Sequence, residues 1–261
     1  MAPAIKIYAD KFEGQVALVT GAAQGIAQVT AELFAAQGAQ VILVDVQKDK
    51  LEAVVKGIVD KGGKATYEVV DVGNEAQVND LVNGVIAKFG QLDILVHLAG
   101  VYPFIPLLEY PTETYRHVMA VNMDAAFFLA RAALPHMNER GYGRIINTSS
   151  GTLQLPDHGL SIYVAAKSAA VGFTRSIAVE AGAGVTANII MPGLIRTQAL
   201  WDLHVKPDGS HYIFDRLIQK QCIKRHGQPE DIAHTVMFIA SPESAFTTGQ
   251  IFDVSGGATF H

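Results

Sequence analysis

Cysteine is nearly absent from this chain of 261 residues, which contains only Cys222, so an internal disulfide is excluded. The nine histidines are dispersed, and no Cys/His cluster has the spacing of zinc ligands, so we predict no metal site. Near the amino end, Lys6, Asp10 and Lys11 interrupt any long apolar run, so neither a secretory signal nor a membrane span is predicted. We therefore expect a cytoplasmic protein.

Charged residues are also scarce and of mixed sign. They make up 17% of the chain, against 49% hydrophobic residues, and the net charge is -5. Without a basic run, nucleic acid and an anionic membrane are poor candidates as partners. No Pro/Gly/Ser-rich linker divides the sequence, so we predict a single domain over residues 1–261.

Short apolar runs alternate with segments long enough for helices. This βαβ alternation predicts an α/β fold with one parallel sheet covered by helices on both faces. The runs lie near residues 16–20, 40–45, 65–70, 92–97, 143–149, 185–191 and 250–254. In such a doubly wound sheet, ligands bind at the carboxyl ends of the strands.

The first run leads directly into a glycine turn and then a helical stretch. Gly21 and Gly25 would let the backbone approach a pyrophosphate, whose charge is met by the helix start. The second run ends in Asp45, whose carboxylate can accept hydrogen bonds from both ribose hydroxyls of an adenosine. Alternatively, the glycines only cap a strand and Asp45 caps a helix. The order of strand, turn, helix, strand and acid favours a Rossmann-like dinucleotide site.

A second constellation comes from the middle of the chain. Tyr163 and Lys167 are four residues apart, so on a helix they share one face, and Ser150 stands upstream after the fifth apolar run. An ammonium beside a phenol favours the phenolate, so Tyr163 is the candidate general acid/base, and Ser150 can hydrogen-bond a developing alkoxide. Each residue also has an ordinary structural interpretation, as a packed phenol, a surface ion or a turn hydroxyl.

Together these segments resemble the short-chain dehydrogenase/reductase family over about residues 12–257. Residues 20–27 resemble the glycine turn of this family, with Ala27 in place of the last glycine. Residues 97–100 stand where the family usually has Asn-Asn-Ala-Gly, so His97 and Leu98 depart from the family pattern. The resemblance implies the catalytic residues Asn122, Ser150, Tyr163 and Lys167. It implies contacts to a nicotinamide dinucleotide from Gly21, Gln24, Gly25, Ile26, Asp45, Asp71, Val72, Ala99, Gly100, Tyr163, Lys167, Pro192, Gly193, Ile195 and Thr197.

The family pattern also implies individual roles. Lys167 would hold the nicotinamide ribose, and Asn122 would support a water through which protons leave. Ile195 and Thr197 would hold the carboxamide. Because Asp45 repels a 2′-phosphate and Gln24 replaces the basic residue of NADP-preferring relatives, we expect NAD(H), with NADP less favoured. Lys48 is the nearest cation in the sequence that could compensate.

Three segments should surround the substrate: residues 101–106, residues 153–158 and a lid over residues 198–226. All three carry apolar or aromatic residues, and no arginine pair or basic cluster is evident, so a neutral ketone or secondary alcohol is favoured. Local resemblances to 1-phenylethanol dehydrogenases (residues 94–106 and the His261 ending) and to the pyridoxal 4-dehydrogenase type (residues 163–194 and 227–230) suggest an aryl carbinol. The lid aromatics Trp201, His204, Tyr212 and Phe214 either contact substrate or pack the lid on the body.

Two other functions stay open at this stage. A 3-oxoacyl-type reductase would share the fold but usually goes with NADPH and a basic patch. A non-catalytic dinucleotide-binding sensor would commonly have lost the tyrosine or the lysine, and this chain keeps both. The resemblance further implies a homotetramer, in which the helices near residues 112–138 and 161–181 form a seam between copies.

Overall fold

The computed structural model describes residues 10–203, 205 and 212–260. Its centre is a sheet of seven parallel strands in the order β3-β2-β1-β4-β5-β6-β7. The strands are β1 (Val16–Thr20), β2 (Gln40–Asp45), β3 (Lys64–Val69), β4 (Ile94–His97), β5 (Gly143–Thr148), β6 (Val185–Pro192) and β7 (Ile251–Val254). All seven predicted runs therefore form strands, with boundaries that differ by at most two residues, and the predicted doubly wound architecture is confirmed.

The burial of the strands explains why their sequences lack a simple polar alternation. All five residues of β1 and all six of β5 are buried, since helices cover both faces of the central sheet. In β1, Ala17 and Val19 face one apolar cluster, and Val16 and Leu18 face the other. The edge strand β3 is only partly covered, which fits its charged residues Lys64 and Glu68.

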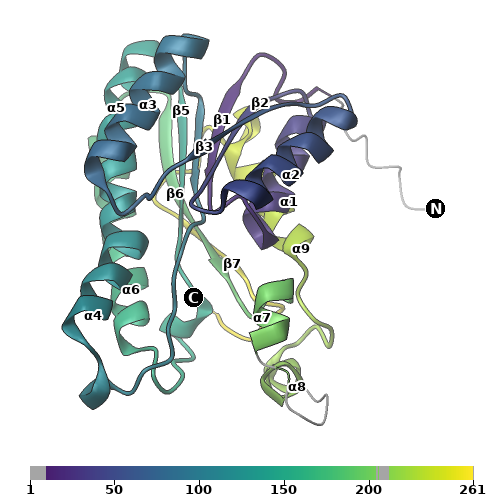
Figure 1. Cartoon of the computed structure of the whole chain (residues 1–261), viewed down its shortest axis with the longest axis vertical. Coiled ribbons are helices and arrows are strands. Elements are labelled where there is room, and N and C mark those ends of the chain that lie inside the picture. The colour runs from purple at the N-terminus through teal and green to yellow at the C-terminus, as the bar shows by residue number, and fades with distance from the viewer. Residues whose placement is uncertain (1–9, 204, 206–211, 261) are drawn as a thin grey trace.

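The helices form two layers on either side of this sheet (Figure 1). One layer contains α1 (Gly25–Ala36), α2 (Lys48–Asp60) and α9 (Pro229–Ala240). The other contains α3 (Glu75–Phe89), α4 (Thr112–Met119), α5 (Ala125–Arg140) and α6 (Ser161–Glu180). Two shorter helices, α7 (Gln198–Leu203) and α8 (Tyr212–Lys220), lie beyond the carboxyl ends of the strands.

A π-helical turn, Ala120–Asp124, joins α4 to α5 and makes one helical run over Thr112–Arg140. Such turns insert a residue into a helix and often mark functional sites. Among the described residues, this run is the one helix long and apolar enough to cross a membrane, with 44% of its most apolar window buried inside the fold. Its buried residues, including Leu129 and Met137, belong to the core beside α3, which is the pattern of a core helix.

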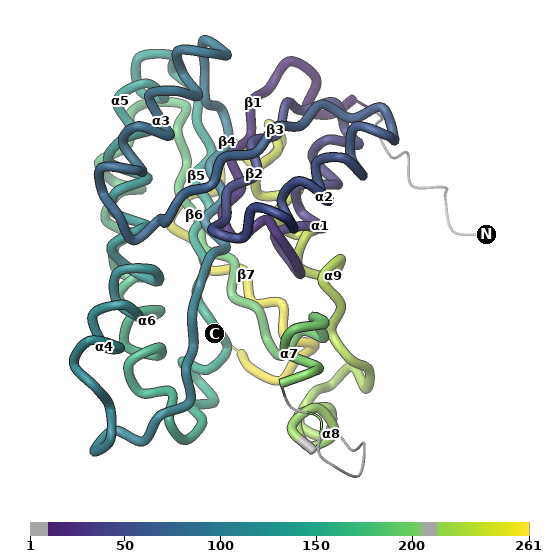
Figure 2. Tube along the Cα trace, viewed as in Figure 1, coloured from purple at the N-terminus to yellow at the C-terminus, as the bar shows by residue number. Residues whose placement is uncertain are grey.

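The segment after β4 leaves the sheet and runs to α4, while α7 and α8 lie on the other side of the same edge (Figure 2). The predicted site residues outside the helices either end a strand at this edge, as Asp45 and Pro192 do, or follow one. The fold therefore brings segments distant in sequence together, where a doubly wound sheet binds its ligands.

Candidate active site

Two adjoining clefts open at the carboxyl edge of the sheet. The first, called here the glycine cleft, is lined by Gly21, Gly25, Asp45, Asp71 and Gly100, among others. The second, called here the tyrosine cavity, is lined by Ser150, Tyr163, Lys167 and the residues after β6. Residues shared by both linings, among them Ile26, Gly100 and Thr197, mark where the clefts meet.

The glycine turn is built by close backbone approach. Gly21 and Gly25 have φ angles of 73° and 65°, in the region that disfavours side chains. A Cβ on Gly21 would lie 2.9 Å from the backbone of Ala99, and a Cβ on Gly25 would lie 3.1 Å from the Thr197 side chain. Ala27 is 3% exposed within the core, so the methyl that replaces the third glycine is accommodated between helix and sheet. The turn thus leaves the start of α1 facing the cleft, as a pyrophosphate site requires.

Asp45 lies at the end of β2, where its carboxylate is held by the two turns around it. Its Oδ2 accepts from the Ala23 N–H at 3.3 Å, and its Oδ1 accepts from the backbone N–H of Gln47 at 3.0 Å. These bonds fix the acid at the position expected for a ribose. Further along the cleft, Asp71 caps its own turn through the Gly73 N–H, and Val72 is buried.

The cation next to this end of the cleft is not the one that the sequence suggested. Lys48 reaches Glu52 on the same helix at 3.6 Å. Lys50 instead donates to the Gln24 side chain at 2.7 Å, across from the glycine turn. The sequence gives no sign of this, because the contact depends on how α2 packs beside α1.

The segment after β6 closes the junction between the two clefts. Pro192 ends β6, and a Cβ on Gly193 would lie 2.7 Å from the Ser255 backbone, so a side chain does not fit there. Ile195 is buried, and the Thr197 hydroxyl accepts from the Leu200 N–H at the start of α7. These residues line the tyrosine cavity.

His97, the main departure from the family pattern, is 1% exposed at the end of β4. Its Nδ1 lies 2.9 Å from the Thr20 hydroxyl, which itself accepts from the backbone N–H groups of Leu98 and Ala99. Because both acceptor positions of the Thr20 hydroxyl are used, the hydroxyl proton of Thr20 is donated to the His97 Nδ1. The imidazole of His97 therefore carries its own proton on Nε2, which has no hydrogen bond of normal geometry. The histidine therefore still ties β4 to β1.

Burial lowers the pKa of His97 to about 3, and the nearby charge of Lys167 acts in the same direction, opposed by the Val121 backbone. The ring is therefore neutral at physiological pH.

Asn122 is placed by the π-helical turn. Its Nδ2 donates to the carbonyls of Val101 and Val118 at 2.8 and 2.9 Å, which ties the turn to the segment after β4. Its Oδ1 is buried and unpaired, and a Cβ on Gly100 would lie 2.8 Å from it and 3.6 Å from the Lys167 Nζ. Gly100 therefore allows the amide and the ammonium to approach one another. An unpaired acceptor in this position fits a bridging water.

Ser150 follows β5 and begins a short 3-10 turn, Gly151–Leu153. Its Oγ accepts from both the backbone N–H and the hydroxyl of Thr152, at 3.2 and 2.9 Å. The Ser150 side chain also lowers the pKa of the Tyr163 phenol, against the larger effect of burial. Thr152 was not singled out by the sequence, and its hydroxyl has no motif that would have identified it.

Tyr163 and Lys167 share a face of α6, as their spacing predicts, with the ammonium 5.8 Å from the centre of the phenol ring. The Ser149 hydroxyl donates to the Lys167 carbonyl at 3.2 Å and fixes this part of α6 against the end of β5. The Tyr102 ring packs edge-on against Tyr163, with centroids 5.8 Å apart.

In the chain without a cofactor, burial outweighs the influence of the neighbouring ammonium on the pKa of Tyr163. Burial raises the pKa of Tyr163 to about 12, opposed by the Ser150 hydrogen bond and reinforced by Tyr102. Burial also lowers the pKa of Lys167 to about 8, which weakens it as a source of positive charge. The phenol is therefore a proton donor in the free protein, and a further positive charge is needed to make it a base.

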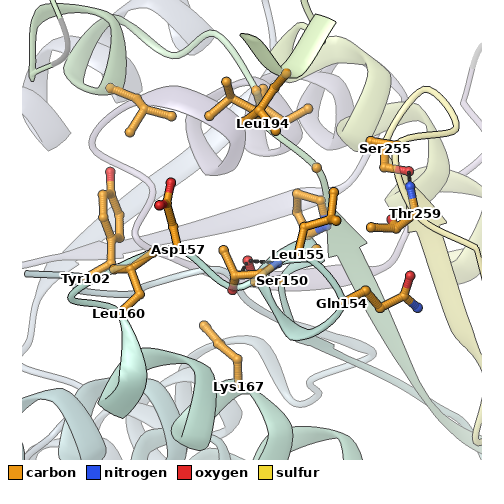
Figure 3. A pocket seen from close by; sticks show the side chains of 18 of the residues that line it. Tyr102, Ser150, Gln154, Leu155, Asp157, Leu160, Lys167, Leu194, Ser255 and Thr259 are labelled. Atoms are coloured by element: carbon orange, nitrogen blue, oxygen red, sulfur yellow. Dashed lines mark hydrogen bonds between the residues drawn. The ribbon is translucent and has the colours of Figure 1, made fainter. Parts of the chain in front are cut away.

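The walls of the tyrosine cavity are mostly apolar and come from the three segments predicted to surround the substrate. Figure 3 shows Ser150 between Tyr102, Leu160 and Asp157 on one side and Ser255 and Thr259 on the other. The cavity has a volume of about 390 Å³, which is enough for an aryl ketone.

The lid aromatics mainly hold the lid together. Phe214 is 1% exposed and packs on Trp201 with ring centroids 5.1 Å apart, while the Arg196 guanidinium lies 4.1 Å from the Trp201 ring. Neither aromatic lines the tyrosine cavity, and both rings also pack against His226 within the lid. His204 and the Tyr212 side chain lie outside the described residues.

Helix α8 lines the cavity with two apolar and two cationic side chains, Ile213, Leu217, Arg216 and Lys220. Arg216 pairs across the opening with Asp157 at 3.0 Å. No basic cluster near the substrate is predicted from the sequence, because these two cations are four residues apart and come together only on a helix face.

The arrangement as a whole combines the glycine cleft with an adjoining cavity that holds a proton donor. Within the described part of the chain, no three His, Cys, Asp or Glu side chains gather as metal ligands. A phenol that shares a cavity with a serine hydroxyl and a buried ammonium can move a proton to or from a carbonyl oxygen.

Comparisons with known proteins agree with this geometry. The family model described as "Enoyl-(Acyl carrier protein) reductase" matches residues 21–259. The chain is similar to the (2S)-[(R)-hydroxy(phenyl)methyl]succinyl-CoA dehydrogenase subunit BbsD of Thauera aromatica, with 37% identity over 94% of this chain and 96% of that protein. It is also similar to the 3-oxoacyl-[acyl-carrier-protein] reductase of Thermotoga maritima, with 33% identity over 95% of this chain and 98% of that protein.

Among solved structures, a short-chain dehydrogenase/reductase from Brucella melitensis has a TM-score of 0.88 and 27% identity, and the alignment covers 97% of this chain and all of that one. Members of this family bind a nicotinamide dinucleotide and act as oxidoreductases. With a matching family model, full-length relatives and the same fold, the chain belongs to the short-chain dehydrogenase/reductase family.

Proposed function

We propose that this protein is an NAD(H)-dependent oxidoreductase that interconverts an aryl secondary alcohol and the corresponding ketone. The observation that carries this proposal is the placement of Ser150, Tyr163 and Lys167 together in the lining of the tyrosine cavity, where the Ser150 side chain lowers the pKa of Tyr163. The apolar walls of the tyrosine cavity and the phenyl carbinol named for the Thauera relative support an aryl substrate.

The cofactor fits the residues present. Gly21, Gly25 and Gly100 line the glycine cleft at positions where an added Cβ would press on neighbouring protein atoms, and Asp45 offers a carboxylate for the ribose. Bound there, the dinucleotide supplies or accepts the hydride and brings a positive charge in its oxidised form. The residues that would hold it are those of the glycine turn, Asp45, Lys167 and the segment after β6.

The chain's own residues supply the proton chemistry. During reduction, the Tyr163 O–H donates to the developing alkoxide while the Ser150 hydroxyl hydrogen-bonds the same oxygen. During oxidation, Tyr163 accepts the alcohol proton, which requires the phenolate. Lys167 stabilises that phenolate, and the unpaired Asn122 Oδ1 offers an acceptor for a water on the route to solvent.

The choice of NAD over NADP rests on Asp45, because a carboxylate repels a 2′-phosphate. Initial rates with NADH and NADPH on the same ketone test this preference. We expect kcat/KM to be at least tenfold higher with NADH, which corresponds to a repulsion of about 1.4 kcal/mol between Asp45 and the 2′-phosphate. A preference for NADPH would show that Lys50, near Gln24, outweighs Asp45.

A second candidate is a 3-oxoacyl-type reductase acting on an anionic thioester. Arg216 and Lys220 on the lid favour it, since a negative substrate group could take the place of Asp157 beside Arg216. The printed names of the Thermotoga and Thauera relatives also include acyl-carrier and CoA substrates.

A panel of acetophenone, 1-phenylethanol, pyridoxal, aliphatic 2-ketones and acetoacetyl-CoA separates these candidates. Adding butyrophenone with its carboxylate counterpart 3-benzoylpropionate isolates the effect of charge at nearly constant shape. Turnover of aryl ketones with equal KM for the matched pair supports the first proposal. A KM at least tenfold lower for the anion, lost in Lys220→Gln, supports the second. If no compound changes NADH absorbance, both fail.

We further propose that the protein is a cytoplasmic homotetramer. Helices α5 and α6 expose Phe127 and Val179, and Phe127 packs against Phe173 on the neighbouring helix. A monomer at micromolar concentration by light scattering would contradict the tetramer.

A further inference from the structure

The geometry around Ser150 points to a role for Thr152 that no family motif assigns. A serine hydroxyl has one proton to donate and two acceptor positions. Around the Ser150 Oγ lie three polar groups: the Thr152 N–H at 3.2 Å, the Thr152 hydroxyl at 2.9 Å and the Tyr163 phenol. Because the N–H can only donate, the hydroxyl proton of Ser150 is donated either to the Thr152 hydroxyl or to the Tyr163 phenol.

The backbone fixes part of this choice. The Thr152 N–H donates to Ser150 as the first bond of the short turn Gly151–Leu153, so one acceptor position of Ser150 is always used. When the Thr152 hydroxyl donates as well, both acceptor positions are full and the Ser150 proton faces Tyr163. Hydroxyls that donate in series also polarise one another, so each donor in the chain is strengthened.

We propose that Thr152 is a positioning residue for the proton transfer: its hydroxyl directs the only proton of Ser150 toward Tyr163 and the substrate oxygen. This inference rests on the proposed function, because it assigns Thr152 a part in the same reaction. Thr152 acts through Ser150, so its loss weakens the hydrogen bond to Tyr163 without removing any group from the reacting atoms. Without Thr152, Ser150 donates less strongly, and Tyr163 is harder to deprotonate.

The test compares Thr152→Val, which keeps the shape and removes the hydroxyl, with Thr152→Ser, which keeps the hydroxyl. For Thr152→Val we expect kcat to fall about five- to tenfold on each of two ketones of different size. This fall corresponds to the loss of one hydrogen bond. In the oxidation direction, the pH at which activity is half-maximal should rise. NADH affinity and the thermal midpoint should stay at the parent values, and Thr152→Ser should restore most of the rate.

A matched control removes a hydroxyl of the same type outside the site. Thr235 lies on α9, where its hydroxyl contacts the Asp231 carbonyl at 3.4 Å, and Thr235→Val should keep the parent pH profile. If Thr152→Val keeps the parent kcat and pH profile, or loses rate only through a KM that differs between the two ketones, the proposal is overturned.

A second readout does not need a substrate. The tyrosinate absorbance that Tyr163→Phe removes identifies the titration of Tyr163 in the NAD⁺ complex, and in Thr152→Val this titration should move to higher pH. An unmoved titration overturns the role of Thr152. If the titration moves while no carbonyl compound is turned over by the parent, the proposed substrate class fails and the positioning role stands.

Discussion

The two clefts of this protein are built in different ways. The glycine cleft consists largely of backbone held by positive-φ turns, where Gly21 touches the backbone of Ala99 and Asp45 is held by neighbouring N–H groups. The tyrosine cavity is assembled from side chains of distant segments, including Thr152, Lys167 and the lid helix α8. A backbone site tolerates little change in residue type, whereas a side-chain site can change its substrate while the fold is kept.

The largest expected effect lies in the tyrosine cavity. Tyr163→Phe removes the proton donor and should lower kcat about 10³-fold, within the range for general acid/base groups. NADH binding, measured by fluorescence, should stay unchanged, because the phenol oxygen is not part of the glycine cleft. The exposed Tyr115 provides the control, and Tyr115→Phe should keep full activity. Near-normal turnover by Tyr163→Phe would remove the basis for the assignment.

The next effect concerns His97, which ties β4 to β1, and it appears as a pH dependence of stability. The pKa of His97 is lowered from 6.5 to about 3 on folding, so the unfolded chain binds the proton more readily across this window. Its contribution to stability is therefore present above pH 6.5 and is lost as the pH falls toward 3, at about 1.4 kcal/mol per pH unit.

His97→Asn should remove this loss and move the acid-unfolding midpoint, followed by circular dichroism, to lower pH. The same change at the exposed His158 should leave the midpoint in place. If both variants unfold at the parent midpoint, His97 is not the group that links acid to unfolding.

A smaller effect is expected from the backbone of the glycine cleft. Gly21→Ala puts a Cβ 2.9 Å from the Ala99 backbone at a φ of 73°, which should cost about 1–3 kcal/mol of stability and at least tenfold in NADH affinity. Gly84 on α3 has nothing within 4 Å of an added Cβ, so Gly84→Ala should be neutral or stabilising. Thermal unfolding and NADH titration compare the two, and equal behaviour would refute the close-approach argument.

The smallest effect is expected at the rim of the glycine cleft. Lys50→Met removes the cation that hydrogen-bonds Gln24. It should lower kcat/KM with NADPH about three- to fivefold, as expected for the loss of one exposed charge, and leave kcat/KM with NADH unchanged. Lys48→Met, on the same helix turn, should change neither cofactor. An equal loss with both cofactors would show that Lys50 supports the turn instead of selecting the phosphate.

The residues that the sequence placed correctly are those tied to a local pattern. The strand, turn and helix around Gly21, and the shared face of Tyr163 and Lys167, follow from periodicity and spacing over short segments. The direction of the Tyr163 pKa did not follow, because the desolvation that raises it to about 12 comes from everything packed around α6, Tyr102 included.

The sequence by itself determined the parallel sheet, the glycine turn and the order of the site residues along the chain, since each depends on neighbours a few positions apart. Only the tertiary structure decided that Lys50 and not Lys48 stands at the cleft, that Arg216 and Lys220 line the tyrosine cavity, and that Thr152 bonds Ser150. The physical reason is that hydrogen bonds and desolvation act over a few ångströms in space, whatever the separation in sequence.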